Sequence, residues 1–163
     1  MLFTEREKHM FEVADVEKPI IAIDRIERPQ TLINTGLPIK VIFTSLSGTL
    51  NALVKANQMA RSNKSPIEIL VFMAIHFAVP LEDRSIRLEF LVRQLKEMAD
   101  QFSEQIKISV YLCRDQWETM AGILDRNCLI LMGVSSGLWP THDERIARML
   151  RHAGHNVILI KPE

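Results

Sequence analysis

Two short segments rich in glycine and hydroxyl side chains are the parts of this sequence best suited to contact a ligand. The first, residues 44–49, reads Thr-Ser-Leu-Ser-Gly-Thr, and the second, residues 133–137, reads Gly-Val-Ser-Ser-Gly. Hydroxyl groups and glycine backbones both allow a ligand to approach closely and form hydrogen bonds. The candidate contacts are Thr44, Ser45, Ser47, Gly48, Gly133, Ser135, Ser136 and Gly137.

Each segment also has a purely structural interpretation. A turn that caps the following helix would explain the hydroxyl residues of the first segment equally well. A flexible connection whose glycines adopt positive φ would explain the second. We regard residues 133–137 as the stronger candidate for ligand contact.

Side chains capable of catalysis are present, but their spacing forms no catalytic arrangement. Cys113 and Asp115 have no histidine near them in sequence, so we interpret them as a core residue and a helix cap. His76 stands alone at a strand end, and such a histidine is more often structural than catalytic. His152 and His155 flank a helix end, where positive charge is favourable without chemistry. We therefore expect neither an enzyme nor a metal site.

Composition narrows the class of protein. The chain has 163 residues, 47% of them hydrophobic, which suits one packed domain. The 20 basic residues balance the 20 acidic ones, so no general attraction to nucleic acid or an acidic membrane is expected. No apolar run reaches the roughly 20 residues of a membrane helix, and acidic residues stand where a signal peptide would be apolar. These features predict a cytoplasmic protein that is not inserted in a membrane.

Hydrophobic patterns predict alternating strands and helices after residue 38. Strands are expected at 41–44, 67–75, 106–112, 128–132 and 156–160, with a loop at 80–85. Helical spacing appears at 50–60, 88–102 and 116–124, and Thr141 to Glu144 has the pattern of a capping box that opens a last helix. This alternation predicts a doubly wound, five-stranded parallel α/β sheet, although periodicity alone does not give its strand order.

The first 38 residues differ from the rest, so we divide the chain into an N-terminal extension (1–38) and a main domain (39–163). Thr4 to Glu7 has capping-box spacing, and residues 20–26 have the composition of a strand. Gly36 and Pro38 mark the break between the two parts.

The C-terminal third resembles the universal stress proteins. The resemblance rests on residues 128–133 (Cys-Leu-Ile-Leu-Met-Gly), 136–138 (Ser-Gly-Leu), 150–153 (Leu-Arg-His-Ala) and 156–160 (Asn-Val-Ile-Leu-Ile). It implies a Rossmann-like sheet in the order 3-2-1-4-5. In such a sheet, ligands bind beyond the carboxyl ends of the strands, at the switch point between the first and fourth strands.

The nucleotide motif of that family is degenerate in this chain. Nucleotide-binding members have an Asp after the first strand and a Gly-x2-Gly-x9-Gly-Ser/Thr loop after the fourth. Here Thr44 holds the Asp position, and Gly133 and Gly137 are spaced Gly-x3-Gly. Asp143 and Glu144 fall on the Gly-Ser pair, where two carboxylates would repel a phosphate. The comparison implies that ATP does not bind in the usual manner, and we expect no cofactor.

Three functions remain open at this point. The first is a non-catalytic regulatory or adaptor domain of the stress-response type. The second is a sensor that binds a nucleoside or an AMP-like ligand at the switch point, and a hydrolase ranks last. Trp139 would stack on a base or a partner in one interpretation and fill the vacated cleft in another. Related domains occur on membrane transporters, so a transporter or another protein is a further partner class.

The last strand is expected to join two copies of the chain. The resemblance places Val157, Ile158, Leu159 and Ile160 at an edge of the sheet, with Lys161 and Pro162 as their only local protection. Unpaired edges invite pairing with another chain, which predicts a homodimer. In the rival arrangement residues 20–26 cover an edge. The same strand order places Cys113, on an edge strand, far from Cys128, so both should stay reduced.

Overall fold

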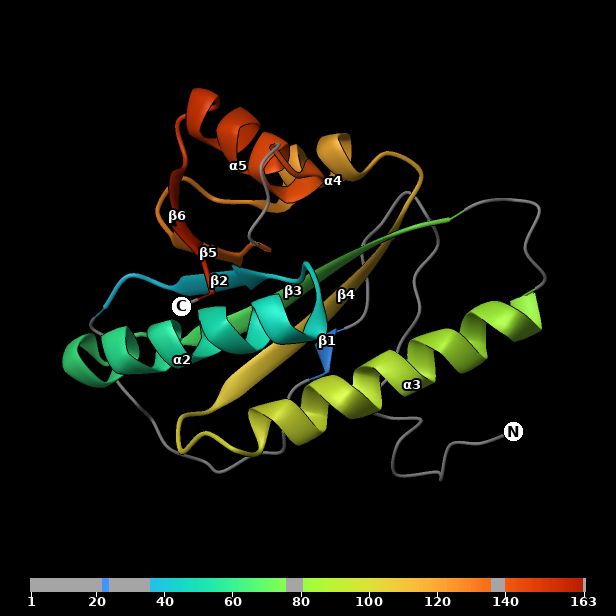
Figure 1. Cartoon of the computed structure of the whole chain (residues 1–163), viewed down its shortest axis with the longest axis horizontal. Coiled ribbons are helices and arrows are strands. Elements are labelled where there is room, and N and C mark those ends of the chain that lie inside the picture. Colours follow the sequence, from blue (N-terminus) through green and yellow to red (C-terminus); the bar gives the residue numbers. More distant parts are fainter. Residues whose placement is uncertain (1–21, 24–35, 76–80, 136–139, 163) are drawn as a thin grey trace.

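The computed structural model describes residues 22–23, 36–75, 81–135 and 140–162 (Figure 1). The strands are β1 (Ala22–Ile23), β2 (Ile39–Ile42), β3 (Ile67–Ala74), β4 (Ile106–Cys113), β5 (Leu129–Gly133) and β6 (Asn156–Ile160). The helices are α2 (Leu46–Asn63), α3 (Leu81–Ala99), α4 (Gln116–Ile123) and α5 (His142–His152).

The strands form one sheet in the order β1-β4-β3-β2-β5-β6. Strands β2 to β6 are parallel. Counted as strands 1 to 5, they lie in the predicted order 3-2-1-4-5, which confirms that prediction. Helices α2 and α3 lie on one side of the sheet, and α4 and α5 lie on the other (Figure 1). The chain therefore reverses its winding direction at β2, whose neighbours are β3 and β5.

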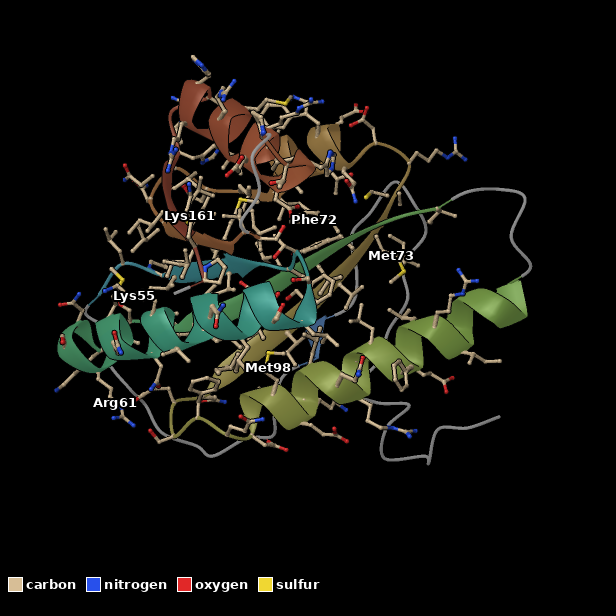
Figure 2. All side chains as sticks on the ribbon, viewed as in Figure 1. Lys55, Arg61, Phe72, Met73, Met98 and Lys161 are labelled. Carbon is tan, nitrogen blue, oxygen red and sulfur yellow. The ribbon has the colours of Figure 1, made fainter. Side chains whose placement is uncertain are left out.

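A hydrophobic core lies on each side of the sheet, because the central strands are buried on both faces. Leu53 of α2 and Leu95 of α3 pack on one face, together with residues such as Met98. Met120 of α4 and Leu150 of α5 pack on the other, together with residues such as Phe72. Figure 2 shows Phe72 and Met98 on these opposite sides.

Strand β1 is a sixth member of the sheet and covers part of the outer edge of β4. It runs antiparallel to β4, with Ala22 opposite Ser109 and Ile23 opposite Ile108. The extension therefore covers an edge, as the rival arrangement proposed, but at the far side from β6. The expectation that Cys113 ends an edge strand is wrong for this reason. The remaining predictions for residues 1–38, including the helix cap at Thr4, fall outside the described residues.

Two boundary predictions are wrong in an informative way. Strand β2 ends at Ile42 rather than at Thr44, because Thr44 turns toward β5 and serves the next helix. Helix α3 begins at Leu81, where a loop to residue 85 was predicted. The sequence places Pro80 just before this helix and Glu82 and Asp83 in its first turn, and both are common helix start signals.

Candidate functional site

The switch point is bridged by a hydrogen bond between two strand ends. Strands β2 and β5 are neighbours, with Ile42 opposite Met132. Just beyond them, the Thr44 hydroxyl donates to the Gly133 carbonyl at 2.5 Å. Thr44 also donates its backbone N–H to the Thr49 hydroxyl at 3.4 Å. The side chain at the family's Asp position is therefore engaged within the protein.

The two glycines beside this bond bring backbone against backbone. A Cβ atom at Gly133 would lie 2.6 Å from the Gly48 Cα and closer still to its carbonyl group. A Cβ atom at Gly48 would lie 2.8 Å from the Gly133 carbonyl oxygen. Both positions need glycine for this close approach, and not for a positive φ, which Gly154 alone among the described glycines adopts.

The hydroxyl residues of the first segment form the helix cap that was one of their two interpretations. Ser45 is the N-cap of α2, and its hydroxyl accepts the Gly48 N–H at 3.0 Å. The Ser47 hydroxyl lies 3.4 Å from that of Ser45, and both side chains are exposed. A solvent-borne ligand can still reach these two hydroxyls.

The second segment is only partly described. Val134 is buried, and its N–H donates to the Ile160 carbonyl at 2.9 Å. Ser135 is exposed beside it. Ser136, Gly137 and Trp139 lie outside the described residues. The fold thus brings the segment of Thr44, Ser45, Ser47 and Gly48 beside Gly133 and places Ser135 two residues beyond that glycine.

The predicted capping box satisfies two N–H groups at the N-terminus of α5. The Thr141 hydroxyl accepts the Glu144 N–H at 3.2 Å, and the Glu144 carboxylate accepts the Thr141 N–H at 3.1 Å. Asp143 adds a second carboxylate to this first turn. Burial raises the pKa of Asp143, partly offset by the charge of His142.

A charged row across three strands was missed by the sequence reasoning. Lys40, Glu68 and Lys107 are each the second residue of their strand, and the register aligns them side by side. Glu68 accepts hydrogen bonds from Lys40 and Ser109, and Lys107 lies 3.6 Å away. A charge at the same position of successive strands was the signal that could have revealed this row.

Electrostatics hold Glu68 in its ionised form. Burial alone would raise the pKa of Glu68, but the hydrogen bonds from Lys40 and Ser109 and the charges of both lysines outweigh it. The pKa therefore falls below its ordinary value of 4.5. The row joins β2, β3 and β4 near their amino ends.

Neither cysteine has the lowered pKa of a reactive thiol. Cys113 and Cys128 are buried free thiols, and burial raises the pKa of each. Within the described ranges, no cluster of His, Cys, Asp or Glu could hold a metal ion. In the same part of the chain, no helix is both long and apolar enough to cross a membrane.

Comparisons with known proteins give a likeness in structure alone. No protein-family model matches the chain, and no curated protein matches it in sequence. The universal stress protein of Archaeoglobus fulgidus, solved with dAMP, superposes with a TM-score of 0.53 at 16% identity, covering 78% of this chain and 99% of that one. The universal stress protein UspA of Lactobacillus plantarum gives 0.53 at 15% identity over the same shares of both chains.

A universal stress protein in complex with cAMP gives a TM-score of 0.50 at 13% identity, covering 77% of this chain and 98% of that one. Each of the three structures is therefore matched over nearly its whole length. Together with the sheet order 3-2-1-4-5, these matches show that the chain has the fold of the universal stress proteins.

Proposed function

We propose that this chain is a non-catalytic regulatory or adaptor domain that pairs with a second copy and does not bind ATP in the usual manner of its fold. The observation that carries the proposal is the N-terminus of α5, where a capping box already uses two N–H groups and two carboxylates lie in the first turn. Anions bind helix N-termini because free N–H groups point at them. Here the Glu144 N–H is already bonded to Thr141, and two carboxylates occupy the turn.

The hydrogen bond between the ends of β2 and β5 also supports the proposal that ATP does not bind in the usual manner. Thr44 donates to Gly133, and Gly48 packs its backbone against that residue. The Thr44 hydroxyl would have to give up its bond to Gly133 in order to donate to a phosphate instead. Because Thr44 is uncharged, it also lacks the carboxylate that the resemblance places there.

The two cysteine thiols are poorly suited to act as nucleophiles. A reactive cysteine needs a lowered pKa and some exposure, whereas both thiols here are buried with raised pKa values. We accordingly propose a role without enzymatic activity and without a resident cofactor.

Nucleotide titration with a thermal-unfolding readout tests this role. A ligand that binds only the folded state adds about 2.7 kcal/mol at one hundred times its dissociation constant. We expect no such stabilisation by millimolar ATP with magnesium. A magnesium-dependent rise in melting temperature at micromolar ATP would refute the proposal.

Neutral variants of Asp143 and Glu144 test whether their carboxylates are what excludes a phosphate. Asp143→Asn and Glu144→Gln keep the size of each side chain, and Gln can still complete the capping box. If carboxylate repulsion excludes phosphate, the double variant should bind AMP more tightly than the wild type. Glu97→Gln, on the remote helix α3, should change nothing. Equal AMP affinity in all three proteins would contradict this mechanism.

A second candidate function is a sensor for a nucleoside or an AMP-like ligand. It is favoured by the similar structures that hold dAMP and cAMP. The exposed hydroxyls of Ser45 and Ser47 could bond a ribose without a phosphate loop. Saturable binding of adenosine or AMP to the wild type, with no response to ATP, would favour this function over the first.

Backbone geometry defines how β6 would pair in the proposed homodimer. The Ile160 carbonyl bonds to Val134, so the alternation of a strand directs the backbone groups of Val157 and Leu159 toward the outer edge. Arg151 already donates to the Val157 carbonyl at 2.9 and 3.1 Å. Lys161 and Pro162 are therefore not the only protection of this edge. Leu159 is the described residue best placed to pair with a second copy.

A matched pair of substitutions tests whether two copies pair through β6. Leu159→Pro removes the outward N–H, and proline is tolerated on edge strands. Leu159→Ala loses the same side-chain contacts but keeps the N–H. We expect the wild type and the Ala variant to sediment as dimers at tens of micromolar and the folded Pro variant to sediment as a monomer. A monomeric wild type would refute the proposed homodimer. A dimeric Pro variant would show that the interface does not involve the outer edge of β6 at Leu159.

A further inference from the structure

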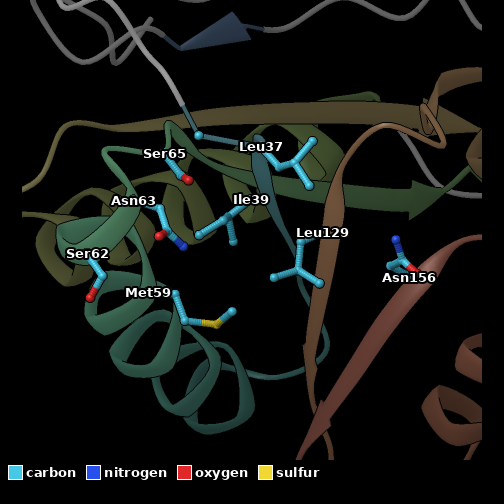
Figure 3. A pocket seen from close by; sticks show the side chains of 9 residues that line it. Leu37, Ile39, Met59, Ser62, Asn63, Ser65, Leu129 and Asn156 are labelled. Carbon is cyan, nitrogen blue, oxygen red and sulfur yellow. The ribbon is translucent and has the colours of Figure 1, made fainter.

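An open groove lies at the amino end of the sheet, opposite the switch point (Figure 3). It is formed by the linker that enters β2, the last turn of α2 and the first residues of β5 and β6. Its volume is about 510 Å³, within the range of small-molecule sites. The lining residues are Gly36, Leu37, Ile39, Met59, Ser62, Asn63, Ser65, Leu129 and Asn156.

The lining has an apolar floor, a polar rim and no charge. Ile39, Met59 and Leu129 supply aliphatic and thioether surface, and Figure 3 shows them between the polar side chains. Serine and asparagine side chains supply the polar groups. A charged ligand would lose its hydration here without gaining an opposite charge. The lining therefore suits an uncharged molecule.

Ser65 offers this groove an unsatisfied hydroxyl. Its side chain is only 9% exposed, and its oxygen lies on the groove side in Figure 3. Among the described residues its hydroxyl has no hydrogen-bond partner. A hydroxyl can donate one hydrogen bond and accept others, so this group is available to a ligand in the groove.

The end of α2 adds hydrogen-bond acceptors. The N–H groups of Lys64 and Ser65 both return to the Ala60 carbonyl, so the later carbonyls of the last turn have no helical partner. Gly36 packs tightly against this turn, since a Cβ there would lie 2.5 Å from the Asn63 carbonyl oxygen. The acceptors are therefore held in place before any ligand arrives.

We propose that this groove binds an uncharged small molecule with an apolar body and hydrogen-bond donors, such as an aromatic primary amide. The apolar body lies on Ile39, Met59 and Leu129. The polar end bonds Ser65 and the carbonyls at the end of α2. Because Ile39 and Leu129 pair at the start of their strands, this site is separate from the strand ends at Thr44 and Gly133.

Amide chemical shifts in a ¹⁵N-labelled sample of the full chain test the proposal, with benzamide as the probe and benzoate as its charged counterpart. Benzamide should shift the amide signals of Ser65, Leu129 and Asn156 in a saturable way, and benzoate should leave them unchanged. Absence of saturation with benzamide, or equal shifts with benzoate, would overturn the proposal.

Substitutions locate the probe in the groove. Ser65→Ala should weaken benzamide binding several-fold, and Met59→Trp should abolish it by filling the space. Ser103→Ala removes a serine outside the groove and should bind as the wild type does. Unchanged affinity in both groove variants would overturn the site. Shifts confined to Thr44 and Val134 would also overturn it and would favour the nucleoside sensor, so the two proposals fail separately.

Discussion

The two ends of the sheet differ in how completely the protein fills them. At the carboxyl ends of β2 and β5, Thr44 bonds Gly133 and two glycine backbones touch. At the amino ends of the same strands, Ile39 and Leu129 instead line an open groove. The end where this fold usually holds ligands is occupied by its own groups, and open space lies at the other end. A conserved sheet order therefore does not determine which end is available to a ligand.

Gly133→Ala changes the contact between the Gly48 and Gly133 backbones directly and should have the largest effect on stability. The new methyl group would overlap the backbone of Gly48, which cannot move without shifting α2. We expect a loss of about 3 kcal/mol in the free energy of unfolding, measured by urea denaturation. Gly122→Ala, where nothing lies within 4 Å, is the control and should gain about 0.5 to 1 kcal/mol. Similar stability of both variants would mean that the strand ends are not in contact.

Glu68→Gln tests how the amino end is held together. The pKa of Glu68 is lowered in the folded state, so ionised Glu68 stabilises the fold above its ordinary value of 4.5. This contribution is lost as the pH falls below that value toward the lowered pKa. At neutral pH we expect the variant to lose about 2 kcal/mol, because Lys40 loses a charged acceptor.

The pH dependence separates this effect from a change in packing. The stability difference between wild type and variant should shrink as the pH falls below the ordinary value of 4.5, measured by urea denaturation at each pH. A difference that is constant over this range would show that the charge of Glu68 does not hold the three strands.

Thr44→Val should have the smallest effect on stability. It tests how much the hydrogen bond from Thr44 to Gly133 holds the two strand ends together. Valine keeps the shape of threonine but cannot donate to the Gly133 carbonyl. We expect a loss of about 1 kcal/mol, together with faster hydrogen exchange at Val134. Thr44→Ser keeps the hydroxyl and should retain most of the protection at that amide. Equal exchange at Val134 in both variants would mean that the glycine contact alone holds the ends of β2 and β5 together.

Local signals in the sequence predicted most of the fold. Thr141 and Glu144 have the spacing of a capping box, and the structure shows both of its hydrogen bonds. The strand at 156–160 and the strand order were also correct, the latter because it came from the resemblance. The Thr44 hydroxyl and the Gly48 backbone, two of the candidate contacts, do meet Gly133 at the switch point. Whether they bind a ligand remains a prediction.

What the sequence could not predict depends on register and on contacts between distant backbones. Lys40, Glu68 and Lys107 lie far apart in the chain and meet only because their strands align. Gly48 and Gly133 likewise look like ordinary loop glycines until α2 packs on β5. The groove arises where the ends of four segments fail to fill space, a property that no single segment carries.

The position of β1 limits how far sheets of this protein can grow by edge-to-edge contact. A sheet with two free edges can add copies at both sides and extend without limit, as fibrils do. Here the strand at the β4 side is β1, which is only two residues long, and very short edge strands offer little backbone for pairing. If two copies pair through β6, as proposed, each copy is left with this short edge alone among the described strands. Deleting the extension would expose the full edge of the eight-residue β4 and should favour assemblies larger than a pair.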